Sequence, residues 1–516
     1  MLVQEFLEQS AEQQPGKTCL VCGDIRLTYA DVEAHANRLA NALMDHGFAR
    51  GDRAVLFLPN SVELVFAIFA VLKAGGVFIV IHPSTKQEKL AYILKNSAAT
   101  ALFADASQNQ RCQSLLDSIP ALTIAILTNQ PRGGSSTLPT IPQWLSSYSD
   151  HRPRHQNIDL DLACLVYTSG STGEPKGVMS DHSNVDFATS SIIQYLENSP
   201  DDVIINTLPL SFDYGLYQLL MSFKFGGRLI LEKGFAFPAA ILNRIGLEQV
   251  TGFPGVPTIY SMLLQMDLSR FNLSSLRYLT NTAAALPTSH IQAIRSAFPA
   301  VRLYSMYGLT ETKRTLYLPP EELDERPGSV GIPIPGTEAW LEDEEGNHLP
   351  AGETGELVVR GRHVMRGYWK DPQLSALRFR PGAIPGERLC YTGDLFRQDT
   401  EGFFYFVARK DDIIKCRGEK VAPREIENVI YQLSGVREAA VIGVPDPLLG
   451  QAIKAFVTVD DPALTESDLM RHCRSNLEDL LVPQQVVIVP ELPKTESGKI
   501  NKKVLSQDVI RPTCVE

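Results

Sequence analysis

A glycine-rich stretch at residues 167–177 carries residue types that can hold a polyphosphate. It reads Tyr-Thr-Ser-Gly-Ser-Thr-Gly-Glu-Pro-Lys-Gly and follows an apolar run at residues 163–166. Glycines let the backbone approach a ligand closely, so that N–H groups can converge on an anion. Lys176 adds a positive charge, and Ser169, Ser171 and Thr172 add hydroxyl donors. The stretch departs from the usual P-loop because Pro175 comes directly before the lysine. A solvated Gly/Ser turn is the alternative interpretation.

Helices and strands alternate along the first ~400 residues, and this alternation predicts an α/β fold of layered subdomains. A helix is expected at residues 28–46, where Thr28 and Asp31 have the spacing of a capping pair. The apolar runs and amphipathic segments that follow predict strands at 54–58, 77–81, 203–208 and 228–231, and a helix near 214–221.

The composition changes near residue 410, where a charged break at 409–412 separates two short apolar runs. Beyond it, the periodicity predicts a small α+β unit. Its expected elements are a strand at 413–416, helices at 423–433 and 466–477, and strands at 436–444, 452–459 and 485–489. We therefore predict a large N-terminal domain over residues 1–410 and a small C-terminal domain over residues 411–516.

The bulk composition is that of a soluble protein of more than one domain. The chain has 516 residues, of which 44% are hydrophobic and 21% charged; this length exceeds what one core supports. Its net charge of −11 argues against nucleic-acid and anionic-membrane partners. No apolar run has membrane-spanning length and no secretory signal is visible. Together with eight dispersed cysteines, these features favour a cytoplasmic protein.

Further motifs follow the glycine-rich stretch in order. They are Tyr-Gly-Leu-Thr-Glu at 307–311, Gly-Glu-Leu at 355–357, Tyr-Thr-Gly-Asp at 391–394, Arg-Lys-Asp at 409–411, and Pro-Lys-Thr-Glu-Ser-Gly-Lys at 493–499. The set resembles the adenylate-forming superfamily of acyl-CoA synthetases, luciferases and peptide-synthetase adenylation domains. The resemblance implies that a carboxylate attacks the α-phosphate of ATP, that pyrophosphate leaves, and that a thiol then displaces AMP. It also implies ATP and Mg²⁺ as cofactors.

The resemblance assigns roles at the nucleotide. The β- and γ-phosphates are expected under Thr168, Ser169, Gly170, Ser171, Thr172, Gly173 and Lys176. Tyr307 is expected against adenine, Asp394 at the ribose hydroxyls and Arg409 at phosphate or ribose. Thr310 would bind the α-phosphate and Glu311 the metal. On local grounds, Glu311 is also explained as a helix-start acid and Asp394 as a turn residue.

Three positions near the domain junction complete the resemblance. Lys499 matches a lysine that swings into the site and bridges the substrate carboxylate and the α-phosphate. Asp411 matches the hinge about which the small domain rotates, and Gly418 would then line the passage for a pantetheine arm. An exposed surface lysine and a plain polar linker are the local alternatives.

The pocket for the acid is indicated by residues 211–215. Asp213 matches the aspartate that pairs with the α-ammonium group in amino-acid adenylation domains, and Phe212 stands where many acyl-CoA synthetases have a histidine. A cap of the following helix is the alternative role for Asp213. The remaining expected pocket residues are Tyr214, Tyr217, Pro254, Thr280, Thr282, Met306 and Thr315. Arg314 faces either this pocket or a surface carboxylate.

The segment 306–320 looks like that of free-standing enzymes that load L-proline onto a carrier protein. We therefore predict adenylation of an amino acid, with L-proline as first candidate, and transfer to a phosphopantetheinylated carrier protein in trans, as in nonribosomal peptide and secondary-metabolite biosynthesis. No carrier segment follows residue 505. An AMP-forming acyl-CoA synthetase for a small or medium acid is the alternative enzyme. A non-catalytic relative is the third class, and the intact set of polar site residues argues against it.

Overall fold

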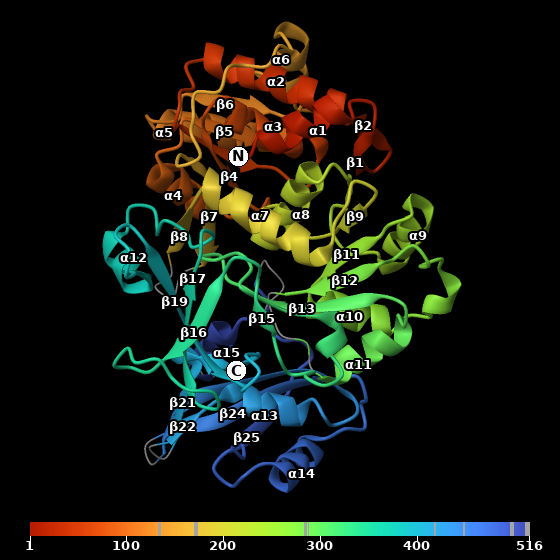
Figure 1. The fold of residues 1–516 in the computed structure, drawn as a ribbon, viewed down its shortest axis with the longest axis vertical. Coiled ribbons are helices and arrows are strands. Elements are labelled where there is room, and N and C mark those ends of the chain that lie inside the picture. The colour runs from red at the N-terminus through yellow and green to blue at the C-terminus, as the bar shows by residue number, and fades with distance from the viewer. Residues whose placement is uncertain are drawn as a thin grey trace, which may run out of the picture.

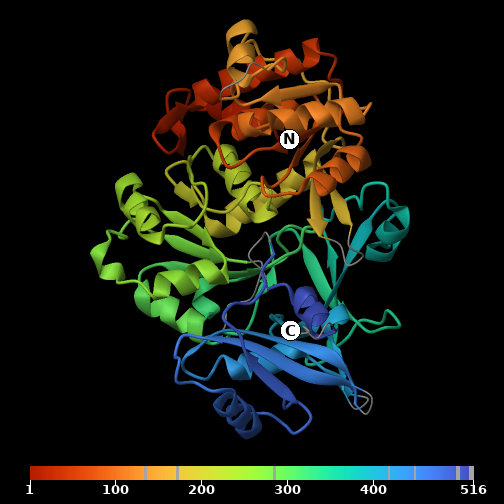
Figure 2. The same cartoon turned by 180° about the vertical axis from the view of Figure 1, so that it is seen from behind.

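The computed structural model describes residues 1–132, 136–169, 174–282, 286, 288–416, 419–446, 449–495 and 500–510. Figures 1 and 2 show a large N-terminal part built of layered sheets and helices, and a smaller C-terminal domain at the opposite end of the molecule. This is the α/β architecture expected from the alternation of elements.

The first sheet contains the glycine-rich stretch at one edge. In order, its strands are β6 (Ile124–Leu127), β5 (Ala101–Ala104), β3 (Arg53–Phe57), β4 (Val77–Val80), β7 (Leu162–Ser169) and β8 (Pro175–Asp181). All neighbours are parallel except β7 and β8, which form an antiparallel pair. The described flanks of the glycine-rich stretch therefore form an edge hairpin.

The second sheet takes strands from both ends of the large domain. Its order is β15 (Ile332–Pro333), β14 (Leu316–Leu318), β13 (Arg302–Tyr307), β12 (Tyr278–Asn281), β11 (Gly252–Gly255), β9 (Val203–Asn206), β10 (Arg228–Leu231), β1 (Thr18–Cys22) and β2 (Ile25–Thr28). Strands β13, β12, β11, β9, β10 and β1 run parallel. Because carboxyl ends of parallel strands share one edge, residues that follow β9, β11, β12 and β13 can gather there.

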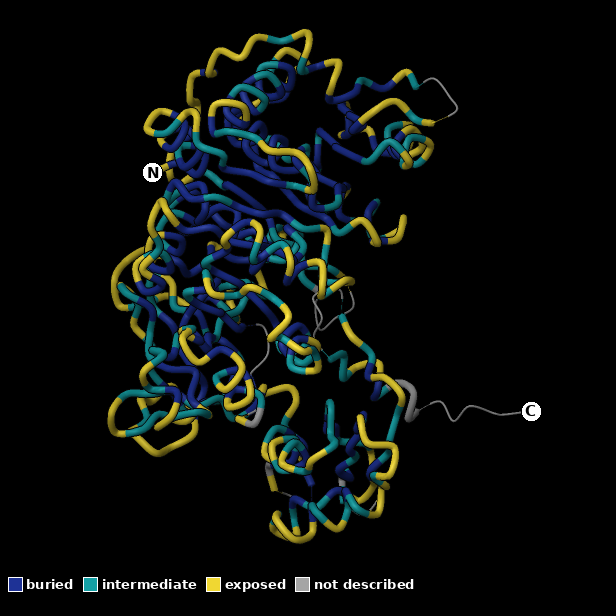
Figure 3. Tube along the Cα trace, turned by 90° about the vertical axis from the view of Figure 1, so that its right-hand side faces the viewer, coloured by how far each residue is buried: buried dark blue, intermediate teal, exposed yellow. Residues whose placement is uncertain are grey.

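Helices between and around these sheets create two cores in the large domain. Residues of β3 alternate between them: Ala54 and Leu56 face one core, Val55 and Phe57 the other, as the period of a strand requires. Figure 3 shows buried residues running through these layers. The helices of this part are α1 (Glu5–Gln13), α2 (Tyr29–Asp45), α3 (Val62–Lys73), α4 (Gln87–Ser97), α5 (Asn109–Ser118), α6 (Ile141–Ser147), α7 (His182–Leu196), α8 (Asp213–Lys224), α9 (Pro238–Glu248), α10 (Pro257–Leu264) and α11 (Thr288–Ala297).

Every residue of helix α3 except Glu63 is buried, including its last residue, Lys73. The Lys73 ammonium is compensated because it donates to Glu8 Oε1 at 2.6 Å and to Glu33 Oε1 at 2.9 Å. A buried charge needs such partners. The ion pairs therefore tie α1, α2 and α3 together inside the layered part.

A third sheet and the C-terminal sheet complete the chain. The third sheet runs β16 (Glu338–Glu342), β17 (Thr354–Arg360), β19 (Arg388–Gln398) and β18 (Phe379–Pro381), with β20 (Phe404–Arg409) on β19 and α12 (Pro372–Arg378) alongside. The C-terminal sheet runs β22 (Glu419–Val421), β21 (Ile414–Cys416), β24 (Gly450–Val459) and β23 (Val436–Asp446), with β25 (Gln485–Ile488) on β24. Its helices are α13 (Pro423–Ile430), α14 (Glu466–Asn476) and α15 (Lys502–Ile510).

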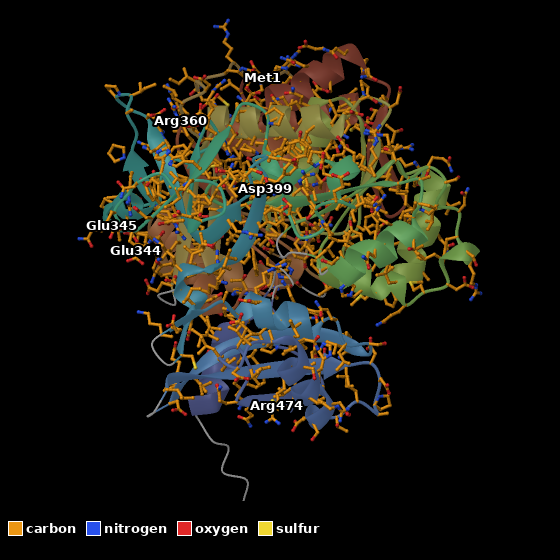
Figure 4. All side chains as sticks on the ribbon, turned by 60° about the horizontal axis from the view of Figure 1, so that its bottom comes forward. Met1, Glu344, Glu345, Arg360, Asp399 and Arg474 are labelled. Carbon is orange, nitrogen blue, oxygen red and sulfur yellow. The ribbon has the colours of Figure 1, made fainter. Side chains whose placement is uncertain are left out.

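Figure 4 shows Arg474 on the C-terminal domain, with Asp399 and Arg360 in the part above it that carries the third sheet. The chain passes from the third sheet to the C-terminal sheet between β20 and β21, and the boundary at residue 411 stays a prediction. The expected elements are found, with their ends shifted by at most three residues. Thr28 and Asp31 form the predicted capping box of α2. No helix in the described ranges is long and apolar enough to cross a membrane.

Candidate active site

The hairpin of β7 and β8 positions the glycine-rich stretch. Thr168 pairs with Lys176 and Tyr167 with Gly177 across the hairpin, so the stretch emerges from two paired strands. Gly170, Ser171, Thr172 and Gly173, and the side chain of Ser169, lie outside the described residues. The structure therefore places the flanks of the predicted phosphate loop, and the roles of its members stay predictions.

Gly177 is a glycine because two aromatic residues pack against it. A Cβ there would lie 3.1 Å from the Tyr167 ring and 3.4 Å from Trp369 Cβ. The Trp369 N–H also donates to the Gly177 carbonyl at 2.7 Å, and Tyr368 forms a bridge with Val178. This contact brings the segment around Tyr368 against the hairpin.

The predicted nucleotide residues Tyr307, Asp394 and Arg409 meet around one carboxylate. Tyr307 ends β13, Asp394 lies on β19 and Arg409 ends β20. The Tyr307 hydroxyl donates to Asp394 Oδ2 at 2.7 Å, and Arg409 Nε donates to Oδ1 at 3.1 Å. Burial raises the pKa of Asp394 overall, although the Arg409 charge and the Tyr307 hydrogen bond lower it. The site thus offers a buried acceptor beside an aromatic ring and a guanidinium.

The turn after β13 carries Thr310 and Glu311. Its position is fixed because Met365 N–H donates to the Glu311 carbonyl at 3.0 Å. The Tyr368 hydroxyl donates to Glu311 Oε1 at 2.6 Å. Within the described ranges, no group of three or more His, Cys, Asp or Glu side chains could hold a metal. A carboxylate with few protein ligands beside it suits Mg²⁺, which keeps waters and substrate phosphates as ligands. Glu311 therefore fits the cation as one protein ligand.

The predicted acid-pocket residues come from α8 and from the carboxyl ends of β11, β12 and β13. Pro254 is paired with Thr280 across β11 and β12. The Tyr214 hydroxyl donates to the Thr280 carbonyl at 2.8 Å and lies 2.6 Å from Thr280 Oγ1. Asp213, Tyr214, Tyr217, Thr280, Thr282, Met306 and Thr315 are all buried. The structure thus brings these residues to one edge of the second sheet, as the topology requires.

The capping role considered for Asp213 is wrong. Helix α8 begins at Asp213 itself, its N-cap is Phe212, and no side chain caps it. No hydrogen bond to the Asp213 carboxylate comes from the described part of the chain, although the residue is only 7% exposed. Its charge contributes to raising the pKa of Tyr217, for which burial is the largest cause. Asp213 is thus a buried acid that lies beside the pocket tyrosines.

Two buried cations, Lys313 and Arg314, lie against the rings of the pocket tyrosines. Arg314 is only 4% exposed, and its guanidinium lies 4.5 Å from the centre of the Tyr214 ring; a surface carboxylate as its partner is therefore excluded. Lys313 was missed by sequence reasoning. It is 1% exposed and has a left-handed φ of 58°. Its ammonium lies 5.7 Å from the centre of the Tyr217 ring. Lys313 and Arg314 are the only charged residues between positions 312 and 320, and this pattern could have indicated a functional role.

Glu356 belongs to the Gly-Glu-Leu motif at 355–357, for which the sequence predicts no role. It is buried, and Oε1 accepts from the Gly393 N–H at 2.8 Å while Oε2 accepts from Lys410 Nζ at 2.6 Å. Gly393 immediately precedes Asp394, and Lys410 immediately precedes the predicted hinge residue Asp411. Glu356 therefore connects the turn at Asp394 to the junction between the two domains.

The hinge and the residues beyond it are placed only in part. Asp411 is exposed in a short 3₁₀ helix, Lys410–Asp412. Gly418 and Lys499 lie outside the described residues. The hinge, the pantetheine passage and the mobile lysine stay predictions.

The fold and the site define an ATP-dependent adenylate-forming ligase, and comparison with known proteins gives the family. Residues 7–369 match the AMP-binding enzymes, and residues 425–499 match the AMP-binding enzyme C-terminal domain. The chain belongs to this AMP-binding enzyme family. ATP and Mg²⁺ are the cofactors of adenylate-forming enzymes, and ATP-bound MatB from Rhodopseudomonas palustris superimposes with a TM-score of 0.88 at 28% identity, covering 98% of this chain and 99% of MatB.

Relatives differ in the acid and in the acceptor. A long-chain-fatty-acid–CoA ligase of Bacillus subtilis (strain 168) is 32% identical, covering 98% of this chain and 94% of the ligase. Gramicidin S synthase 2 of Brevibacillus brevis is 28% identical over 98% of this chain but only 11% of the synthase. The protein is thus an AMP-forming ligase that acts on a small-molecule acid, and its relatives do not give that acid.

Proposed function

We propose that the protein adenylates an amino acid, with L-proline as the first candidate, and transfers the aminoacyl group to the phosphopantetheine thiol of a carrier protein in trans. The observation that carries this proposal is the buried Asp213 carboxylate, which accepts no hydrogen bond from the described residues and does not cap α8. A buried carboxylate is costly without a partner. The ammonium group of an amino acid supplies one.

The side chains expected to line the pocket support a compact acid. Tyr214, Tyr217, Thr280 and Met306 are buried around it. The hydrogen bond of Tyr214 to Thr280, and that of Tyr195 to the Met306 sulfur at 2.9 Å, hold Tyr214, Thr280 and Met306 in place. Fixed aromatic walls favour a small ring or short aliphatic group over a long flexible chain.

The relatives favour a second candidate, an AMP-forming CoA ligase for a small or medium carboxylic acid. The feruloyl-CoA synthase of Amycolatopsis sp is 33% identical and covers 95% of this chain and 96% of that enzyme. The two candidates share the adenylation step. They differ in the substrate ammonium group and in the thiol acceptor.

The experiment that separates them is acid-dependent exchange of labelled pyrophosphate into ATP. We would screen the standard amino acids together with fatty and aryl acids. Exchange with L-proline, followed by loading of a holo carrier protein but not of CoA, is expected. Exchange confined to fatty or aryl acids would overturn the amino-acid proposal, and thioester formation with CoA would establish the second candidate.

The role of Asp213 has its own test. Asp213→Asn keeps the size of the side chain but removes its charge, and Asp213→Ala removes both. Both variants should weaken amino-acid binding and leave ATP affinity close to that of the wild type. Unchanged amino-acid affinity in Asp213→Asn would show that the carboxylate charge does not bind the ammonium group.

A further inference from the structure

The turn after β13 contains a cation that the described protein leaves without a hydrogen-bond partner. Lys313 Nζ and Arg314 Nε are buried, and neither donates a hydrogen bond to an acceptor among the described residues. Arg314 Nη1 reaches only the Lys313 carbonyl, at 3.3 Å. Burying charged donors without acceptors is costly. Two adjacent buried cations without acceptors therefore indicate that an anion binds at this turn.

The backbone holds Lys313 in an unusual conformation. Its φ of 58° is left-handed, which is costly for a residue with a side chain. The turn is closed so tightly that a Cβ on Gly308 would lie 2.0 Å from the Lys313 carbonyl oxygen. The turn therefore fixes the lysine inside the protein, where a surface lysine would need no such conformation.

The surroundings of the two cations are those of the acid pocket. The Lys313 ammonium faces the Tyr217 ring, and the Arg314 guanidinium faces the Tyr214 ring. Asp213 belongs to the same cluster. The charges of Asp213 and Lys313 both contribute to the pKa of the buried Cys164 thiol, and those of Asp213 and Arg314 to the pKa of the Tyr217 phenol. Among the described residues, Lys313 Nζ and Arg314 Nε have no hydrogen-bond partner. Neither atom is therefore hydrogen-bonded to the Asp213 carboxylate.

We infer that Lys313 and Arg314 are the anion-binding half of the acid pocket: they receive the ionised carboxylate of the substrate while Asp213 receives its ammonium group. The pocket then selects amino acids as zwitterions, and this inference rests on the proposed function. The position in the chain agrees, since both cations follow within three residues of Glu311. A carboxylate that attacks the α-phosphate must come close to the turn that carries Thr310 and Glu311.

The test uses the full-length enzyme and three related compounds. L-Proline has both charges, cyclopentanecarboxylate lacks the ammonium group, and pyrrolidine lacks the carboxylate and serves as a competitive inhibitor. In Lys313→Met and Arg314→Gln, the KM for L-proline should rise about 10- to 100-fold, the range expected for a hydrogen bond to a charged group. The affinity for ATP and inhibition by pyrrolidine should stay near wild type. Lys233→Met, at an exposed lysine, is the matched control.

The melting temperature without substrate gives a second readout. Removing a buried charge that lacks a partner should stabilise the free protein, so Lys313→Met should melt higher than wild type while it binds the acid more weakly. A lower melting temperature would show that Lys313 has a structural partner and would overturn the inference.

Different results would overturn the proposed function and the inference about the two cations. Exchange supported only by acids without an ammonium group would overturn the proposed function. A wild-type KM in both Lys313→Met and Arg314→Gln, with whichever acid is active, would overturn the inference about the cations.

Discussion

Gly308→Ala tests whether the turn after β13 must keep its position for adenylate formation. A Cβ at residue 308 would lie 2.0 Å from the Lys313 carbonyl oxygen, 2.9 Å from its carbonyl carbon and 3.0 Å from Arg314 Cα. All three are backbone atoms. Since side-chain carbons essentially never approach closer than 3.0 Å, the turn must move by at least 1.0 Å. Thr310 and Glu311 lie inside this turn and move with it.

The expected effect on activity is large because reacting groups tolerate little displacement. A misplacement of about 1 Å costs about 100-fold in rate, so pyrophosphate exchange by Gly308→Ala should fall by about this factor. The crowding should also lower the free energy of unfolding by about 1–3 kcal/mol. Exchange measured with labelled pyrophosphate, together with a thermal melt of the same sample, separates the two effects.

The matched control is Gly328→Ala. A Cβ at residue 328 meets nothing within 4 Å, so this variant should retain wild-type exchange and stability. Wild-type exchange in a folded Gly308→Ala enzyme would refute the reasoning, because it would show that the turn can move without disturbing the predicted α-phosphate and metal residues.

Three further predictions concern the buried ion pairs, the predicted catalytic lysine and the predicted metal ligand. Burial raises the pKa of Glu8, but the His155 hydrogen bond and the Lys73 charge outweigh it and lower the pKa from 4.5 to about 2. That drop corresponds to about 3 kcal/mol of stability. This stabilisation is fully present above pH 4.5 and is lost as the pH falls through 2. In urea unfolding, Glu8→Gln should therefore be less stable than wild type by about this amount at pH 7, and the two proteins should become equally stable in acid. Lys499→Ala should abolish adenylate formation while thioester formation from supplied adenylate survives; equal loss of both half-reactions would contradict the domain rotation. Tyr368→Phe removes the hydrogen bond to Glu311 Oε1, worth about 1 kcal/mol, so a Mg²⁺ titration of exchange should shift about fivefold; an unchanged titration would exclude Tyr368 from positioning Glu311.

Local sequence patterns were enough to predict α8, which carries Asp213, and several elements away from the site. The capping box at Thr28 and Asp31, the strand at Arg228–Leu231 and the helix at Glu466–Asn476 are set by residues within a few positions of one another. Periodicity and capping report on such short distances along the chain. The order of the motifs likewise identified an adenylate-forming enzyme before any contact was known.

The contacts between these motifs required the tertiary structure. Glu311 meets Tyr368 across 57 residues, and Glu356 meets Lys410 across 54. The sequence supplied the buried charges of Lys313 and Arg314 but could not show that they are buried, because burial depends on which strands and helices fold against the turn. The types of the reacting residues were therefore determined by the sequence alone. Their partners, and the charge balance around the acid, were decided only when distant segments packed together, since electrostatic energy depends on distance in space and on exclusion of water.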